Sequence, residues 1–372
     1  MKRLFCLLLV LCLLLCACGK KAAEVPAEPS VPATTTLPAT EATTEATEPT
    51  TEATEPPTEP TTPPLGQVNP LTGEPLDAVY TGRPVSFTIN NHSACLPQYG
   101  LNHLDWMFEV ETEGGITRCV GIMTDPTIAG AIGPVRSCRT YFLNISVSYN
   151  APLFHCGGSS FADAFQYSQT ENLPNWDHVN EKSTSKYFYR DNNRYNNLGY
   201  AWEHTLFTSG ELMVQAMADK GYDQTSGEAV DYGYRFSQDV ALEGQTADSI
   251  NIEFLGGKDT TMVYDAQSGL YLAHQDGRDW VDGDTGENAT FRNVLVITTS
   301  QAKVASGHSF YNLEGTGDGY FACDGKMIPV KWHHEGVDGP FRFTQEDGTP
   351  ITLGVGSTYC AIVSTDGSIT AE

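Results

Sequence analysis

The sequence predicts an α+β protein, in which an N-terminal mixed α/β module is followed by a mainly antiparallel β module of open-barrel or sandwich type. Three observations lead to this prediction. Alternating apolar residues and short helical stretches share residues 67–235. Short strands separated by glycine-rich turns fill residues 236–372. Residues 19–66 are rich in Thr, Pro and Glu and carry neither pattern, so the folded part is expected to begin near residue 67.

The first 18 residues resemble a bacterial lipoprotein signal peptide. Lys2-Arg3 precede an apolar run from Leu4 to Leu15, and Ala17 places a small residue directly before Cys18. The resemblance implies that Cys18 becomes the lipidated first residue of a mature chain that is anchored to the outer side of the cell membrane. The alternative is an ordinary cleaved signal or an N-terminal membrane anchor, although a membrane span needs about 20 apolar residues.

Residues 19–66 are predicted to form a disordered stalk. The stretch from Ala22 to Gly66 holds eight glutamates and has no aromatic residue, lysine or arginine. Such a composition buries too little apolar surface to offset the entropy of ordering. At about 3.1 Å per residue in polyproline geometry, the stalk reaches at most on the order of 140 Å. We therefore expect a folded domain that is held well away from the lipid surface.

Charge and cysteine content restrict the class of protein. The formal net charge is −25 and the folded part has no cluster of Lys and Arg, which argues against nucleic acid as a partner. An extracytoplasmic location permits disulfides, but the sequence does not assign their pairing. There is no Cys-x-x-Cys pair, so we predict neither a metal nor another cofactor. The cysteines of the folded part are Cys95, Cys119, Cys138, Cys156, Cys323 and Cys360.

A strand over residues 83–90 and a hairpin over residues 106–123 are predicted first in the folded part. Apolar residues alternate along the strand, and Gly114-Gly115 suits a two-residue hairpin loop. Pairing outward from that loop sets Glu111 opposite Arg118 and places both on one face.

The same face of this predicted hairpin carries Glu109, Glu111 and Glu113. Carboxylates at alternate positions stand about 6.8 Å apart along a strand, so Glu109 and Glu111 are candidates for an acid and base pair across a bound polymer. The alternative is a solvated strand face with one cross-strand ion pair.

A candidate anion site is expected after the hairpin. Residues 132–139 indicate a turn that enters a helix, with Pro134 near the first helical position. Arg136 and Arg139 are three residues apart, so on a helix they share a face and can grip one anion.

A second stretch has the pattern of a backbone anion site. The buried strand Leu153 to Cys156 ends in Gly157-Gly158-Ser159, and residues 161–167 look helical. A strand, a glycine pair and a helix start can present backbone N–H groups to an anion. The alternative is a plain helix cap, because Ser160 and Asp163 form a capping box. We expect Arg136, Arg139 and His155 to converge on the Gly157-Gly158 loop.

The last third of the chain is predicted to be β-rich. A helix over Gly210 to Lys220 precedes it, and the change of pattern falls between Asp231 and Val240. Glycine pairs and Asp-Gly turns separate the strands. The predicted strands are Ser249 to Phe254, Thr261 to Tyr264, Tyr271 to His274, Asn293 to Thr298, Gly319 to Cys323, Met327 to Trp332, Phe341 to Thr344 and Tyr359 to Val363.

The motifs of the folded part resemble the YerB-like family of bacterial cell-surface lipoproteins. The resemblance runs from about Asn69 to the C-terminus and implies a two-part domain of unknown function on a lipid-anchored protein. The motifs that carry it are Asn69-Pro70-Leu71-Thr72-Gly73, Ile89-Asn90-Asn91, Glu113-Gly114-Gly115-Ile116-Thr117-Arg118, Ile132-Gly133-Pro134-Val135-Arg136-Ser137, and His155 with Gly157-Gly158-Ser159.

The chain departs from the family at two places. Glu203-His204-Thr205 stands where the family tends to have Pro-His-Asn, and His333-His334 replaces a lysine after Trp332.

Other short motifs of the chain are incomplete. Ser183-x-x-Lys186 lacks the Lys-Thr-Gly of penicillin-recognising enzymes, and Asp282-x-Asp284 lacks the final glutamate of a calcium loop.

Two functions remain after these observations. The favoured one is a binding or scaffold lipoprotein for an anionic wall component or a partner protein, with Arg118, Arg136, Arg139, His155, Gly157, Gly158 and Ser159 as ligand-binding residues. It rests on the stalk and on the lack of a complete catalytic set. The alternative is an envelope-polymer hydrolase, with Glu109 or Glu113 as the acid/base and an anion site at Arg136, Arg139 and His155. His155 is also a candidate catalytic residue in that case.

Overall fold

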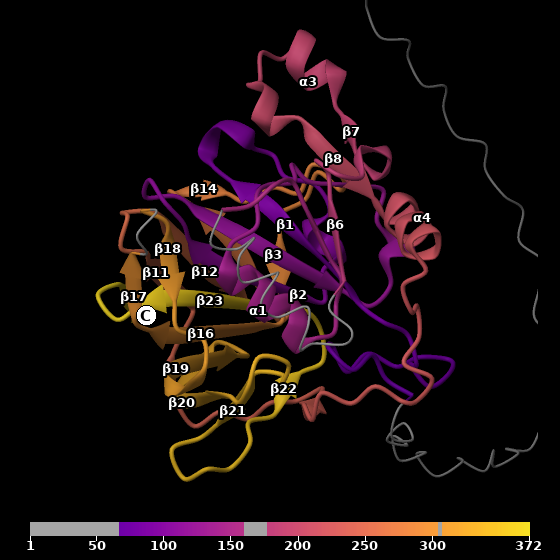
Figure 1. Cartoon of the computed structure of the whole chain (residues 1–372). Helices are drawn as coiled ribbons and strands as arrows, with labels where there is room; N and C mark the ends of the chain where they lie inside the picture. The colour runs from indigo at the N-terminus through magenta and orange to yellow at the C-terminus, as the bar shows by residue number, and fades with distance from the viewer. Residues whose placement is uncertain (1–66, 160–176, 304–306) are drawn as a thin grey trace, which may run out of the picture. The chain divides into compact units, whose positions relative to one another are not determined.

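An eleven-stranded mixed sheet runs through the folded part of the chain (Figure 1). The computed structural model describes residues 67–159, 177–303 and 307–372. The predicted signal peptide, the stalk and the helix at 161–167 with its capping box lie outside these residues. The strands in sheet order are β10 (Gln245–Thr246), β20 (Lys326–His334), β19 (Gly315–Cys323), β16 (Asn293–Thr299), β23 (Thr358–Ser364), β2 (Trp106–Glu111), β3 (Thr117–Met123), β1 (Val85–Asn91), β5 (Leu153–His155) and β6 (His178–Asn180), with β21 (Arg342–Thr344) paired to β20.

A six-stranded sheet and several short elements complete the fold. The six-stranded sheet consists of β14 (Arg278–Asp279), β13 (Leu270–Gln275), β12 (Asp259–Asp265), β11 (Ser249–Glu253) and β24 (Ser368–Ala371), with β15 (Thr290–Phe291) on β13. The small sheets pair β17 (Gln301–Lys303) with β18 (Ser309–Tyr311), β22 (Leu353–Gly354) with β9 (Phe236–Ser237), and β4 (Ala131–Ile132) with β8 (Leu206–Ser209) and β7 (Tyr189–Arg190). The α-helices are α1 (Thr140–Ser148), α3 (Asn192–Asn196) and α4 (Gly210–Lys220), and the 3₁₀ turns are η1 (Ser93–Cys95), η2 (Leu101–His103), η3 (Pro126–Ile128), η4 (Ser185–Tyr187) and η5 (Trp202–His204).

The two faces of the large sheet are buried in different cores. On one face, Phe87 and Met107 belong to a cluster that also holds Ile252 and Met262 of the six-stranded sheet. On the other face, side chains of β2 and β3 pack with α1 and with β16 and β23, in a second cluster. Because side chains alternate along a strand, successive residues of β2 and β3 enter opposite cores. This alternation decides which polar residues can meet.

The two halves of the chain share the large sheet. Strand β23, near the C-terminus, lies between β16 and β2 and pairs with both in parallel. The pairing with β2 runs from Trp106 opposite Thr358 to Val110 opposite Ile362. The predicted strands on both sides of residue 235 therefore contribute to one hydrogen-bonded layer, and the sheets are open rather than closed into a barrel.

The predicted hairpin exists, but its register was wrong by one residue. Glu111 lies opposite Thr117, and Arg118 lies opposite Val110. The N–H of Thr112 donates to the carbonyl of Ile116 over 2.8 Å, so the loop has three residues instead of two. A one-residue shift of register moves a side chain to the other face of a sheet. Arg118 therefore faces α1, whereas Glu109 and Glu111 face the six-stranded sheet.

The prediction of a helix entered at Pro134 was also wrong. Helix α1 begins at Thr140, and the segment before it is extended. The N–H of Val135 donates to the carbonyl of Leu206 over 2.7 Å, and the N–H of Cys138 donates to the carbonyl of Gly157 over 2.9 Å. These backbone groups are bound to distant segments and are not available to a helix. Arg136 and Arg139 therefore do not share a helical face.

The remaining predicted elements of the described part are confirmed. The helix over Gly210–Lys220 has the predicted bounds, and the hydroxyl of Ser209 caps it by accepting from the N–H of Leu212. All eight strands expected after residue 249 are present, with ends that differ by a few residues. None of the six cysteines of the described residues is in a disulfide.

Candidate functional site

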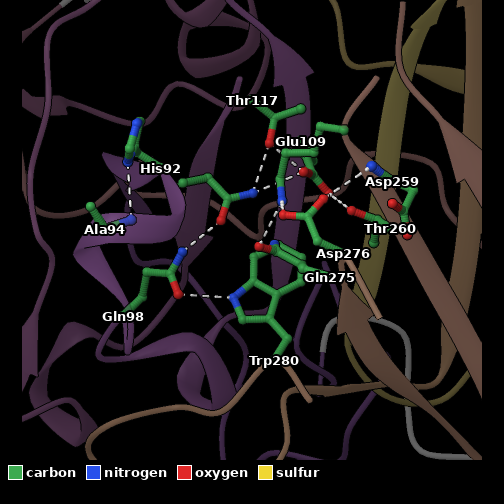
Figure 2. A network of polar contacts seen from close by, with 12 residues as sticks. His92, Ala94, Gln98, Glu109, Thr117, Asp259, Thr260, Gln275, Asp276 and Trp280 are labelled. Carbon is green, nitrogen blue, oxygen red and sulfur yellow. Dashed lines mark hydrogen bonds and ion pairs between the residues drawn. The ribbon is translucent and has the colours of Figure 1, made fainter. Parts of the chain in front are cut away.

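Glu109 is a fully buried carboxylate that four donors hold. Its side chain is 0% exposed. Oε1 accepts from Asn91 Nδ2 at 2.9 Å and from Thr117 Oγ1 at 2.5 Å. Oε2 accepts from Thr260 Oγ1 at 2.9 Å and from the Tyr359 hydroxyl at 2.6 Å. Figure 2 shows how Glu109, Thr117 and Thr260 point toward one another from both sheets.

The hydrogen bonds continue beyond Glu109 through buried amides. Gln98 Nε2 donates to Asn91 Oδ1 over 2.6 Å, and the indole N–H of Trp280 donates to Gln98 Oε1 over 3.0 Å (Figure 2). Burial and the charge of Glu109 raise the pKa of Tyr359, so its hydroxyl stays protonated and keeps donating. Each oxygen of Glu109 thus has two internal donors, which are the contacts of a structural carboxylate.

Glu113, the second candidate acid, is bound to Arg139. Arg139 Nε donates to both carboxylate oxygens at 3.1 Å, and Nη2 donates to Oε2 at 2.7 Å. The N–H of Ser309 adds a bond of 2.9 Å to Oε1. Burial raises the pKa of Glu113, but these hydrogen bonds and the charge of Arg139 outweigh burial and lower that pKa to about 2. A carboxyl group with this pKa is ionised at neutral pH and is a poor proton donor.

Glu111, the third carboxylate of the predicted row, is also engaged. It is 7% exposed, and its Oε2 accepts from the N–H of Gly256 over 3.1 Å. Burial raises its pKa. Glu109 therefore contacts β12 of the six-stranded sheet, Glu111 contacts the turn between β11 and β12, and neither stands on a solvated strand face.

Arg118 is a buried arginine on the α1 side of the large sheet. It is 5% exposed, and Nη1 donates to the carbonyl of Ser137 over 2.8 Å. Its guanidinium carbon lies 5.9 Å from the centre of the Phe142 ring. Nε is buried and has no hydrogen-bond partner among the described residues. Burial and the positive charges of Arg139 and Arg136 lower the pKa of Arg118 to about 10.

Arg136 lies in the extended segment before α1, and its guanidinium also forms few hydrogen bonds. Its Nη1 donates to the carbonyl of Glu203 over a long 3.4 Å. Its Nε is buried and lacks a partner in the described part of the chain. The backbone carbonyl of Arg136 accepts from the N–H of Cys156 over 3.0 Å, which sets this segment directly beside the predicted glycine loop.

His155 and Gly157 use their polar groups inside the protein. His155 Nδ1 lies 2.7 Å from the carbonyl of Gly157, and its Nε2 lies 3.0 Å from His178 Nδ1. Because a carbonyl only accepts, Nδ1 of His155 carries a proton, and its Nε2 is engaged by His178. Burial and His155 lower the pKa of His178 to about 4, which keeps that ring neutral. No ring N–H of His155 remains for an anion.

The glycine loop is likewise built into the fold. The N–H of Gly157 donates to Asn180 Oδ1 over 2.9 Å, and Gly158 bridges to Cys138. Ser159 is 4% exposed. The loop therefore lies beside the Arg136–Arg139 segment. Its Gly157 N–H, however, is already taken by Asn180.

Asn90 and His204 are polar residues of this region that the sequence did not single out as a pair. Asn90 Oδ1 accepts from the N–H of His92, so its Nδ2 is the group that donates to His204 Nδ1 over 2.8 Å. The proton of the neutral His204 ring is then on Nε2. Burial and the charge of Arg136 lower the pKa of His204, which favours this neutral form. The two residues are 114 positions apart, and no local motif joins them.

Over residues 67–159, 177–303 and 307–372, no three His, Cys, Asp or Glu side chains gather as metal ligands do. Within those same ranges, no helix is both long and apolar enough to cross a membrane.

Family models match both halves of the folded part. The N-terminal domain of the family described as "Protein of unknown function (DUF3048)" matches residues 71–223, and its C-terminal domain matches residues 250–360. The chain therefore belongs to this family of proteins of unknown function.

Similarity to one solved protein supports the same assignment. The Bacillus subtilis (strain 168) protein named "Putative lipoprotein YerB" is 26% identical over 278 residues, which cover 71% of this chain and 77% of that protein. The crystal structure of the Bacillus subtilis YerB protein matches with a TM-score of 0.68 and 25% identity, over 82% of this chain and 99% of that chain. The predicted resemblance to YerB-like lipoproteins is confirmed.

The contacts of Glu109 predict a large effect on stability. Glu109→Ala leaves four buried donors without an acceptor and should lower the free energy of unfolding by about 3 kcal/mol. Denaturant unfolding measures the change. Glu287→Ala, at an exposed turn glutamate, is the matched control and should change it by less than about 0.5 kcal/mol. Equal effects of the two substitutions would contradict a structural role for Glu109.

The lowered pKa of Glu113 predicts a pH-dependent contribution. A carboxylate with a lowered folded-state pKa stabilises the fold above its unfolded pKa near 4.5, and this stability is lost as pH falls toward about 2. Glu113→Gln should therefore cost on the order of 2 kcal/mol at pH 7, allowing for the partial exposure of the pair. The cost should shrink between about pH 4.5 and 2. Urea unfolding of both proteins across this range tests it, with Glu287→Gln as the control, and a constant difference would refute the assignment.

Proposed function

We propose that this protein is a binding or scaffold module of the cell envelope, tethered to the outer side of the membrane through a lipidated Cys18. One observation carries the proposal. Both candidate acids, Glu109 and Glu113, are held by internal donors, whereas Arg118 and Arg136 keep buried N–H groups without acceptors among the described residues. The site thus offers positive charge and hydrogen-bond donors, whereas the carboxylates of Glu109 and Glu113 are both engaged.

The ligand of this module is an anionic wall component or an acidic segment of a partner protein. Arginine suits either because its planar N–H groups match carboxylate and phosphate oxygens. The net charge of −25 disfavours loose attraction of anions over the whole surface. Selective binding then depends on the local group formed by Arg118, Arg136 and Arg139.

The leader sequence and the name of the lipoprotein relative support the proposed tether and location. The stalk that the sequence predicts, with a reach of at most on the order of 140 Å, would let the domain contact wall material at a distance from the lipid. The relative's name supports the anchor and gives no ligand.

Binding without cleavage is the expected behaviour. The full-length acylated chain in detergent should sediment with purified cell-wall fragments and release no soluble fragments detectable by mass spectrometry. Glu113→Gln should leave this absence of release unchanged. Release of fragments by the wild type that disappears in Glu113→Gln or Glu109→Gln, but not in Glu287→Gln, would overturn the proposal in favour of the hydrolase.

A further inference from the structure

Three arginines come from the segments around the amino end of α1, and in the described residues only Arg139 of these is paired with a carboxylate. Arg118 comes from β3, Arg136 lies in the segment before the helix, and Arg139 is the residue at the N-cap position. Glu113 pairs with Arg139 alone, and within the described residues neither Arg118 nor Arg136 forms an ion pair. The group therefore keeps an excess of two positive charges. Placing like charges together is unfavourable, most of all for the buried Arg118, unless an anion joins them.

Arg118 has unused hydrogen-bonding capacity. It is 5% exposed, and among the described residues its side chain makes one hydrogen bond, from Nη1 to the carbonyl of Ser137. Its Nε–H finds no acceptor in the parts of the chain that are described, and the same is true of Arg136. A buried N–H group without an acceptor costs about 1–3 kcal/mol, and more when it belongs to a charged group. A ligand oxygen would remove this cost.

The amino end of α1 adds to the positive potential. This helix has nine residues, its first turn holds no acidic residue, and no side chain caps it. The uncapped N–H groups and the helix dipole favour an anion at this end. The buried Arg118 independently favours an anion at the same place, because its guanidinium lies over Phe142 in the first turn of this helix.

The pair of Arg139 with Glu113 shows how many guanidinium N–H groups one carboxylate binds in this protein. The carboxylate of Glu113 takes the Nε and Nη2 edge of one guanidinium, at distances from 2.7 to 3.1 Å. One carboxylate is therefore matched by one arginine. Arg118 and Arg136 each leave the Nε–H of this edge without a partner among the described residues, which calls for a ligand with more than two acceptor oxygens.

We propose that Arg118 and Arg136, together with the amino end of α1, bind a phosphoryl group. A phosphodiester or phosphate monoester carries three or more acceptor oxygens and can bridge two guanidinium groups, which a carboxylate cannot do as well. Arg139 is a positioning residue, because Glu113 occupies its side chain. The phosphoryl group can belong to an anionic wall polymer or to a lipid headgroup. This inference rests on the proposed binding function and narrows its ligand.

Inorganic phosphate is the probe that tests the site directly. The ¹⁵N-labelled full-length chain, in a sugar detergent and a phosphate-free buffer, is titrated while the arginine Nε–H resonances are followed by NMR. Phosphate should shift the resonances of Arg118 and Arg136, which Arg→Lys variants assign, and acetate should bind at least about ten-fold more weakly. Arg118→Gln and Arg136→Gln should each weaken phosphate binding about ten-fold or more. Arg278→Gln, at an exposed arginine of β14, is the matched control and should bind within about two-fold of the wild type.

Two further arms identify the source of the phosphoryl group. Displacement of phosphate by a glycerol-phosphate polymer assigns the site to wall material, and displacement by phosphatidylglycerol vesicles assigns it to lipid. Absence of any shift at Arg118 and Arg136 in the wild type, or acetate binding as tight as phosphate, would overturn the site whether or not the variants fold. If wall fragments bind Arg118→Gln as well as they bind the wild type, the phosphoryl site is refuted and the proposed binding function still stands.

Discussion

The buried carboxylate of Glu109 is the interaction on which the rest of the structure depends. It receives Thr117 from β3, Thr260 from the six-stranded sheet and Tyr359 from β23, so one side chain joins both sheets and both halves of the chain. A buried charge is tolerated only when donors surround it, and here each oxygen has two. Glu109 thereby fixes the face that β2 turns toward the six-stranded sheet. Its neighbours in the strand are committed to the opposite face.

This alternation also separates the acids from the bases. With Glu109 and Glu111 on one face, Val110 and its partner Arg118 face α1. Arg118 is therefore placed on the side where Arg136 and Arg139 precede α1. Glu113, in the loop between the strands, forms an ion pair with Arg139. The register of the hairpin thus decides on which face Arg118 lies, and the extended segment before α1 brings in Arg136 and Arg139. Burial of Glu109 and Glu111 against the six-stranded sheet leaves neither carboxylate open to a bound polymer, as the predicted acid and base pair required.

The sequence predicted the elements that depend on local patterns. The helix over Gly210–Lys220 carries its own cap at Ser209, and the strands after residue 249 carry their alternation and turns. The hairpin register could not be obtained in this way, because Gly114 and Gly115 both have positive φ and suit loops of two or three residues. The helix expected at Pro134 failed because the N–H groups of Val135 and Cys138 bind Leu206 and Gly157. Long-range partners of this kind, like the pair formed by Asn90 and His204, have no local signal.

A double-mutant cycle between Glu109 and Tyr359 tests the central claim most directly. The claim is that the carboxylate of Glu109 stabilises the two joined sheets through its buried donors and has a structural role, not a catalytic one. Unfolding free energies of Glu109→Ala, Tyr359→Phe and the double variant give the coupling between the two side chains. We predict a coupling of about 1–2 kcal/mol, typical of residues within one buried hydrogen-bond network. Effects that add to within about 0.3 kcal/mol would contradict the account.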